Sequence, residues 1–317
     1  MWPRGGSLRA GLVLTPVFLI VVALGSCGRP VRPDHAALVP TGPPEAYVGA
    51  ELCKACHEPA FNRFAHTKMG RLFLNQPRTE KEKMGCENCH GPGRAHVEAG
   101  GTQPMPVAFT KKGKETVEVR NAVCLQCHER TARLFWEGSS HESRDVACTN
   151  CHRVMDEVSP KFNLARVTEL ETCGQCHVEK RAQQYRTSHM PLLEGKMTCS
   201  SCHNPHGSVT PALLKENSTN ETCYACHAEK RGPFLWEHPP VTENCGNCHD
   251  PHGTNNERML KVPKPRVCQQ CHIETRHPTR PYGTDSGSLK FVLGRGCTSC
   301  HFAIHGSNHP SGFAYTR

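Results

Sequence analysis

Residues 199–207 read Cys199-Ser-Ser-Cys202-His203-Asn-Pro-His206-Gly, and residues 245–253 repeat this pattern as Cys-Gly-Asn-Cys-His-Asp-Pro-His-Gly. The core of both stretches, Cys-x-x-Cys-His, occurs ten times in the chain. The motif is typical of covalent haem attachment, because two thiols add to two vinyl groups of one porphyrin and the next imidazole binds its iron. We therefore expect ten haem c groups and a fold built around them.

The ten motifs use 20 of the 21 cysteines. The cysteines expected to hold the porphyrins are Cys53, Cys56, Cys86, Cys89, Cys124, Cys127, Cys148, Cys151, Cys173, Cys176, Cys199, Cys202, Cys223, Cys226, Cys245, Cys248, Cys268, Cys271, Cys297 and Cys300. The proximal iron ligands expected beside them are His57, His90, His128, His152, His177, His203, His227, His249, His272 and His301. Zinc sites and disulfide frameworks explain the repetition poorly, because neither needs a histidine after every second cysteine.

The chain has few hydrophobic and aromatic residues from which to build an ordinary side-chain core. Of the 317 residues, 37% are hydrophobic and 6% are aromatic, whereas a typical soluble domain is nearly half apolar. We expect the porphyrins to form the interior, so that the chain without haem cannot offset its conformational entropy and does not fold.

The formal net charge of +9 does not indicate a nucleic-acid-binding protein. Arg4 and Arg9 belong to an N-terminal leader, and each ferric haem with two propionates contributes about −1. Ten haems would make the holoprotein mildly acidic, and we interpret the lysines and arginines as partners of the propionates.

The motifs form five two-haem repeats with a period of about 50 residues. Within the repeats, in order, the two motifs begin at Cys53 and Cys86, Cys124 and Cys148, Cys173 and Cys199, Cys223 and Cys245, and Cys268 and Cys297. Pro, Gly, Asn and Ser between the motifs favour loops. The predicted fold is a multihaem cytochrome c of short α-helices and irregular loops wrapped round a haem row, elongated and with very little β-structure. Residues 116–119 alternate and suggest one small strand.

Ten six-coordinate haems need ten distal ligands, and eleven histidines lie outside the motifs. We set aside His35, which lies in a Pro-rich segment near the N-terminus. The expected distal ligands are His66, His96, His141, His189, His206, His238, His252, His277, His305 and His309. Such bis-His coordination leaves no open iron position for a substrate.

One position departs from the pattern. Met155 stands three residues after His152, where His206 and His252 stand after their own motifs. Either His309 completes an all-histidine set, or Met155 binds the fourth iron and leaves one of His305 and His309 without an iron. A thioether ligand would raise the potential of that haem.

The N-terminus has the features of a bacterial lipoprotein leader. Arg4 and Arg9 precede an apolar run over residues 11–25, and Leu24-Gly-Ser-Cys27 resembles a lipobox. We expect residues 1–26 to be a signal peptide for Sec export and Cys27 to carry the lipid. Residues 27–48, rich in Pro, would form a tether, and residues 49–317 the decahaem domain. The predicted location is the periplasmic side of the outer membrane.

Three further stretches are similar to the MtrA/DmsE family of decahaem cytochromes. They are Met-Pro-Leu-Leu-Glu-Gly-Lys-Met-Thr-Cys at 190–199, Glu-Lys-Arg-Gly-Pro-Phe-Leu-Trp-Glu-His at 229–238, and Ile-His-Gly-Ser-Asn-His-Pro-Ser-Gly at 304–312. The resemblance implies a cytochrome that inserts into a porin-like outer-membrane β-barrel. It would pass electrons between periplasmic or inner-membrane cytochromes and an extracellular multihaem cytochrome or reductase. The lipobox and Met155 are departures, since the family pattern implies a released protein and a histidine at that position.

The sequence leaves several functions to compare. A conduit performs no chemistry on the protein, which supplies only spacing, ligands and insulation. A multihaem nitrite or hydroxylamine reductase needs a five-coordinate haem, which the supply of ligands disfavours. A membrane-tethered periplasmic electron shuttle and a subunit of a cytochrome filament are further alternatives. We expect electron transfer without catalysis.

Overall fold

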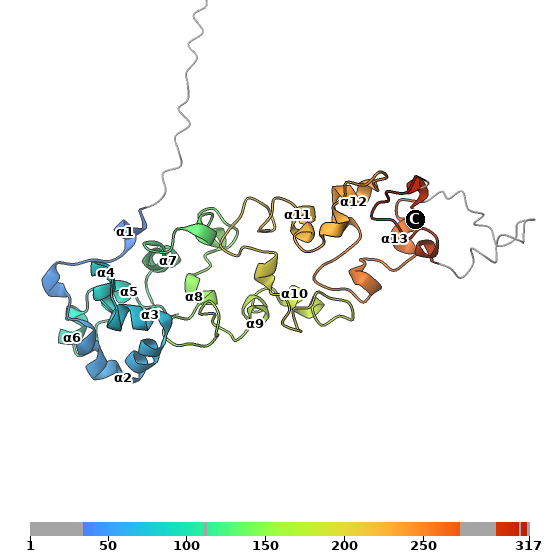
Figure 1. Ribbon diagram of the computed structural model, residues 1–317. Coiled ribbons are helices and arrows are strands. Elements are labelled where there is room, and N and C mark those ends of the chain that lie inside the picture. The colour runs from blue at the N-terminus through green and yellow to red at the C-terminus, as the bar shows by residue number, and fades with distance from the viewer. Residues whose placement is uncertain (1–33, 111–112, 273–295, 311, 316–317) are drawn as a thin grey trace, which may run out of the picture. The chain divides into compact units, whose positions relative to one another are not determined.

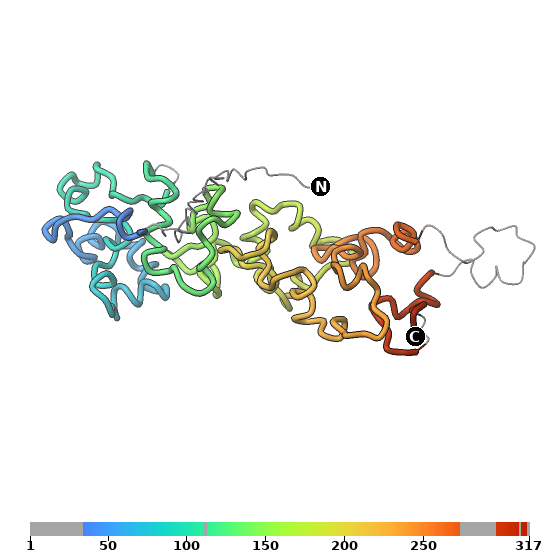
Figure 2. Tube along the Cα trace, turned by 90° about the horizontal axis from the view of Figure 1, so that it is seen from above, coloured from blue at the N-terminus to red at the C-terminus, as the bar shows by residue number. Residues whose placement is uncertain are grey.

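The computed structural model describes residues 34–110, 113–272, 296–310 and 312–315. The chain divides into two units, Met1–Asp34 and His35–Arg317. All described residues except Asp34 belong to the second unit, where the elements follow one another in chain order (Figures 1 and 2). The predicted signal peptide, the predicted lipidation site Cys27 and the candidate ligand His277 lie outside the described residues.

The second unit consists of short helices joined by turns and loops. Its α-helices are α1 (His35–Leu38), α2 (Ala50–His66), α3 (Lys68–Gly70), α4 (Glu80–Lys83), α5 (Glu87–His90), α6 (Arg94–Glu98), α7 (Val117–Leu125), α8 (Cys148–Cys151), α9 (Glu169–Cys173), α10 (Val178–Gln183), α11 (Thr219–Tyr224), α12 (Pro239–Glu243) and α13 (Arg266–Gln269). In the described ranges β-structure is limited to five isolated bridges. The predicted class, short helices and irregular loops with very little β-structure, is confirmed.

The two motifs of a repeat sit on different local structures. In the second, third and fourth repeats the first motif begins near the end of a helix that a hydroxyl side chain caps. Thr116, Thr168 and Ser218 accept hydrogen bonds from backbone amides in the first turns of α7, α9 and α11, and these caps satisfy amides that have no partner within the helix. The second motif lies on a single turn, such as α5, α8 or the 3-10 turns at Cys199–Ser201, Cys245–Asn247 and Cys297–Ser299.

The strand suggested for residues 116–119 is wrong, because these residues begin α7. Thr116 caps the helix, and helical spacing buries Ala122 and Val123 against Val39 and Val107. An alternation over four residues is too short to outweigh a cap and a buried helical face.

The C-terminal part of the predicted tether, from His35 onward, belongs to the folded unit. Residues 35–38 form α1, which packs on α7, and Val39 is buried in the same cluster. Further on, the carboxylate of Glu87 accepts hydrogen bonds from the amides of Val48 (3.0 Å) and Gly49 (2.8 Å). Residues 35–48 are therefore held against the cytochrome body by apolar burial and by Glu87.

The side-chain core is small. Eleven hydrophobic residues are buried in the described part of the chain, and the largest fully buried side chains there are Glu87, Val107 and Thr67. Most of the interior must therefore come from something other than side chains. None of the helices that the structure describes is long and apolar enough to cross a bilayer.

Candidate haem-attachment sites

Within each repeat, the first cysteines of the two motifs touch. The 20 motif cysteines are free thiols, which stand where thioether sulfurs would be in a haem-bound protein. The hydrogen bond with Cys86 lowers the pKa of Cys53 to about 7. Thiol–thiol hydrogen bonds of this kind join Cys53 to Cys86, Cys124 to Cys148, Cys173 to Cys199, Cys223 to Cys245, and Cys268 to Cys297.

Between repeats, the second cysteines of adjacent motifs approach each other. Burial raises the pKa of Cys89 to about 11, and the nearby Cys127 of the next repeat adds to this effect. Three further pairs behave in the same way. Burial raises the pKa of the first cysteine in each, and the second cysteine of the pair raises it further. The pairs are Cys151 with Cys176, Cys202 with Cys226, and Cys248 with Cys271. These electrostatic interactions relate every repeat to the one that follows.

Together the two kinds of contact join all ten motifs in the order of the sequence. Contacts within repeats link the first motif to the second, and contacts between repeats link the second to the third, up to the tenth. Because each motif would carry one haem on its two cysteines, haems attached here would be neighbours in the order of their motifs. The arrangement can therefore hold a single row of haems.

Buried side chains fix the two motifs of a repeat relative to each other. Asn220 donates to the carbonyls of Val241 and Thr242 and accepts from the amide of Cys245 at 2.7 Å. Asn121 makes the equivalent bonds in the second repeat, including one from the amide of Cys148 at 2.8 Å. Both asparagines stand three residues before the first cysteine of their repeat, a signal that sequence reasoning missed.

Six pairs of histidines face each other at nearly one separation. Their ring centres are 5.9–6.3 Å apart. Each pair joins a motif histidine to one of the expected distal histidines. The pairs are His57 with His96, His177 with His141, His152 with His206, His203 with His252, His272 with His238, and His249 with His305.

This separation fits one iron between two imidazoles. A metal-bound imidazole nitrogen lies about 2 Å from the metal, and the ring centre lies about 1 Å further, so two rings on opposite sides of one iron have centres about 6 Å apart. Among the described residues, no three His, Cys, Asp or Glu side chains gather into a metal site. The paired rings therefore suit an iron whose four other ligands come from a porphyrin.

Backbone carbonyls orient many of these rings. Nδ1 of His152 lies 2.9 Å from the carbonyl oxygen of Phe162, and Nδ1 of His141 lies 2.7 Å from that of Pro205. The same contact orients His66, His90, His96, His189, His203, His238, His249 and His301. An Nδ1–H that donates to a carbonyl leaves Nε2 for the iron, the usual arrangement for a metal-bound imidazole.

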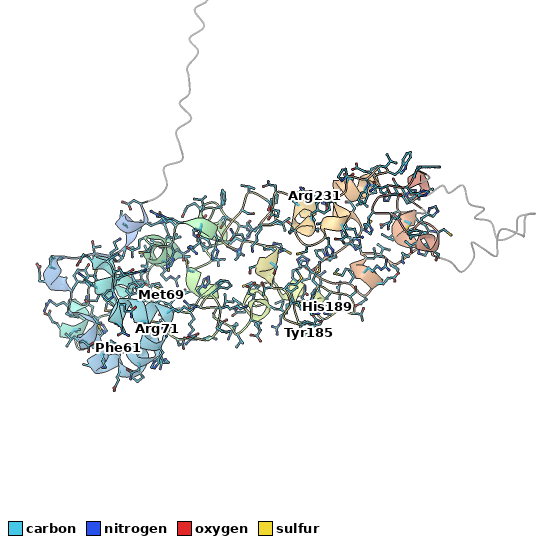
Figure 3. The ribbon with its side chains drawn as sticks, in the orientation of Figure 1. Phe61, Met69, Arg71, Tyr185, His189 and Arg231 are labelled. Carbon is cyan, nitrogen blue, oxygen red and sulfur yellow. The ribbon has the colours of Figure 1, made fainter. Side chains whose placement is uncertain are left out.

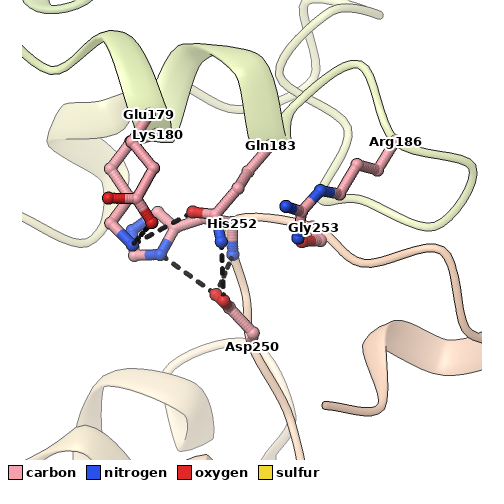
Figure 4. A network of polar contacts seen from close by, with 7 residues as sticks. All are labelled: Glu179, Lys180, Gln183, Arg186, Asp250, His252 and Gly253. Atoms are coloured by element: carbon pink, nitrogen blue, oxygen red, sulfur yellow. Dashed lines mark hydrogen bonds and ion pairs between the residues drawn. The ribbon is translucent and has the colours of Figure 1, made fainter. Parts of the chain in front are cut away.

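His252 is oriented by a carboxylate instead. Its Nδ1 lies 3.2 Å from Oδ1 of Asp250, and Gln183 donates to the other carboxylate oxygen of Asp250 at 2.9 Å (Figure 4). Arg186 donates to the carbonyl of Gly253 at 3.2 Å. The third repeat thus holds the loop of the fourth repeat that directs His252 toward His203.

Burial keeps several of these imidazoles neutral. It lowers the pKa of His206 to about 4, and the nearby His152 and Arg133 lower it further. Burial likewise lowers the pKa of His90, His128, His238, His252 and His305. Only a neutral imidazole can bind a metal, so these sites favour the ligating state.

The structure brings some of the predicted ligands together and leaves others apart. His206, and not Met155, lies opposite His152. For His90, His128 and His227, no second imidazole lies at this separation within the described ranges. Of the remaining candidates, His189 lies in the loop after α10, with Nε2 3.1 Å from a carboxylate oxygen of Glu194 (Figure 3). His66 lies at the end of α2, with its Nδ1 2.6 Å from the carbonyl oxygen of Asn62.

His35 differs from the candidate ligands. It is buried, and its Nε2 lies 3.5 Å from Glu129 and 3.3 Å from Glu137. Its Nε2 faces carboxylates, and among the described residues its Nδ1 has no hydrogen-bond partner, so the ring is turned the opposite way from the ten rings above. This agrees with setting His35 aside as an iron ligand.

Comparison with known proteins supports haem binding by these motifs. A family model of doubled CXXCH motifs matches residues 189–232 and 238–277, and a model of NrfB-like c-type cytochrome proteins matches residues 86–176. The multiheme cytochrome MtrA of Shewanella baltica is 45% identical over 270 residues, which cover 83% of this chain and 80% of that protein.

A more distant relative is the C-type polyheme cytochrome OmcB of Geobacter sulfurreducens. It is 22% identical over 67% of this chain, and the match covers 29% of OmcB. The OmcC cytochrome of the same organism is 24% identical over 64% of this chain. The Cys-x-x-Cys-His motifs, the facing histidines and the extent of the match to MtrA agree, and the chain belongs to the MtrA-type multihaem c-type cytochromes, which transfer electrons through covalently bound haem.

Proposed function

We propose that this protein is the periplasmic part of an outer-membrane porin–cytochrome conduit and carries electrons through ten covalently bound haems. The observation that carries the proposal is the unbroken succession of interacting cysteines from Cys53 to Cys297. A row of haems attached in this order would give an electron a path along the chain without chemistry on the protein. Such a conduit serves extracellular respiration or, with reversed flow, the oxidation of an external donor.

The ligand geometry favours a conduit over an enzyme. Six facing histidine pairs would leave their irons without an open position, and a nitrite or hydroxylamine reductase needs at least one open iron. Carbon monoxide separates the two functions, because it binds a reduced five-coordinate haem. We expect the reduced wild-type protein to bind none, and rapid binding at one haem would favour the reductase.

The proposed setting is the periplasmic side of the outer membrane. The lipobox at Cys27 supplies the anchor, and the similarity to MtrA supports a porin-like β-barrel as the partner. Electrons would pass between periplasmic or inner-membrane cytochromes at one end and an extracellular multihaem cytochrome or reductase at the other.

A mild-detergent pull-down of the full lipidated protein from outer membranes tests this function. Haem staining and mass identification should recover a large β-barrel protein, with or without a second multihaem cytochrome. A variant with Cys27→Ser separates the anchor from the partner, because it loses the lipid and keeps the cytochrome surface. Recovery of the wild-type protein with periplasmic proteins alone would leave a membrane-tethered shuttle as the function.

A further inference from the structure

Distal ligands follow a rule among the second motifs of the repeats. His152 faces His206, His203 faces His252, and His249 faces His305. In each pair the distal histidine comes shortly after the second motif of the following repeat. These irons would therefore take their distal ligand from the next repeat along the chain.

First motifs follow the opposite rule. His177 faces His141, and His272 faces His238. Each of these distal histidines follows the first motif of the preceding repeat. By this rule His66 of the first repeat would be the distal ligand of the iron at His128 in the second repeat. The rule for second motifs places the distal ligand of the iron at His90 in the second repeat as well.

Met155 occupies the distal-ligand position of the second repeat. The motif histidines of three repeats start the same hairpin, with bridges from His152 to Leu164, from His203 to Leu214 and from His249 to Leu260. The amides of the next residues, Arg153, Asn204 and Asp250, donate to the carbonyls of Asn163, Leu213 and Met259 at 2.7–2.9 Å. Met155, His206 and His252 therefore stand at the same point of one backbone frame.

An ion pair closes the turn around Met155, and the Met155 side chain is exposed. Arg153 forms an ion pair with Asp156, across the same four-residue turn in which the amides of Gly207 and Gly253 donate to the carbonyls of Asn204 and Asp250. Met155 is 39% exposed, so its side chain is not packed into an apolar core.

No imidazole faces His90 at the separation of the six pairs in the part of the chain that the structure describes. In the described part of the chain, the aromatic ring against His90 is Phe109, which meets it edge-on with centres 5.5 Å apart and planes at 81°. Nδ1 of His90 lies 2.9 Å from the carbonyl oxygen of Val107, so its Nε2 is oriented for iron.

We propose that Met155 is the distal ligand of the iron bound by His90. The second haem is then a His/Met haem among bis-His neighbours. A thioether favours ferrous iron, so this haem has a higher potential than those beside it and retains an electron near the N-terminal end of the row. The proposal requires a haem on Cys86 and Cys89, but it does not depend on a membrane partner.

Near-infrared magnetic circular dichroism of the oxidised holoprotein tests the ligand, since a thioether–iron bond gives a charge-transfer band that two imidazoles do not. The wild-type protein should show this band at the intensity of one haem. Met155→His and Met155→Leu should abolish it, and in Met155→His the potential of one haem should fall. Met84→Leu is the matched control, because Met84 lies two residues before Cys86 and should leave the band unchanged.

A variant with Cys86→Ser and Cys89→Ser identifies the iron. Intact mass should show the loss of one haem, and the band should disappear with it. Absence of the band from the wild-type protein, its persistence in Met155→His, or its survival after loss of the second haem would overturn the proposal. The haem count from mass and the membrane pull-down report separately on the conduit function.

Discussion

The imidazole rings of His152 and His206 lie with centres 5.9 Å apart and planes at 10°, although they belong to different repeats. One iron between them would bind the second repeat to the third. The same exchange of ligands recurs from His203 to His252. Haems held in this way would connect two repeats, whereas the iron between His57 and His96 would lie within the first repeat. Where a haem connects two repeats, the electron path and the tertiary structure depend on the same bonds.

Removal of His206 should open the fourth iron. In His206→Ala we expect the reduced protein to bind one carbon monoxide per molecule, measured as a Soret difference spectrum, because the iron loses its distal ligand. His35→Gln is the control, since His35 faces carboxylates, and should bind none. Carbon monoxide binding in both variants, or in neither, would contradict the assignment.

Glu87 should stabilise the first repeat. Its buried carboxylate accepts from the amides of Val48, Gly49 and Gly93 at 2.8–3.2 Å. Glu87→Ala should lower the free energy of unfolding of the holoprotein by about 1–3 kcal/mol, because buried amides lose their acceptor. Glu87→Gln should cost less, since one oxygen remains.

Guanidinium unfolding followed by circular dichroism measures this loss. Glu80→Ala provides the control, because the side chain of Glu80 is 88% exposed and its removal should change stability by at most about 0.5 kcal/mol. Equal effects of Glu87→Ala and Glu80→Ala would show that the carboxylate does not hold residues 48–49.

Asp250 should lower the potential of the sixth haem. Its carboxylate accepts from Nδ1 of His252 and makes that imidazole a stronger donor to iron, which favours the ferric state. Asp250→Asn should therefore raise the potential of one haem in a spectroelectrochemical titration. Glu179→Gln, in the same cluster (Figure 4) but with a side chain 79% exposed, should leave the titration unchanged. An unchanged or lowered potential in Asp250→Asn would count against this role.

The chain without haem should not fold. The buried apolar residues are few, and the cluster around Val39, Val107 and Val123 involves only the N-terminal part of the unit. Chain entropy would then exceed the gain from burial. Protein exported without haem attachment should be degraded by dilute protease and lack a cooperative thermal transition, and a compact, resistant apoprotein would contradict this.

The attachment motifs were predictable because covalent chemistry dictates their spacing. Two thioethers and one iron bond demand Cys-x-x-Cys-His wherever a haem is attached, so the motifs and the short helices could be read directly. The preference of Pro, Gly and Asn for turns explains why loops were also predicted correctly.

Ligand pairing could not be predicted in this way. His141 and His177 are adjacent only because their repeats pack together. The residues around each histidine do not predict that contact. The fourth iron shows the consequence, because Met155 is near His152 in sequence whereas His206 faces it in space. The strand suggested for residues 116–119 failed for a related reason, since burial of Ala122 and Val123 favours the helix.

The central claim is that ten haems follow one another in the order of their motifs and share ligands between repeats. Anomalous X-ray diffraction at the iron edge, from crystals of the holoprotein, measures the iron positions directly. We expect ten irons in chain order, with one iron between the rings of each of the six facing pairs, including His152 and His206. Fewer irons, a break in the order, or an iron at His152 with a different distal ligand would contradict the account.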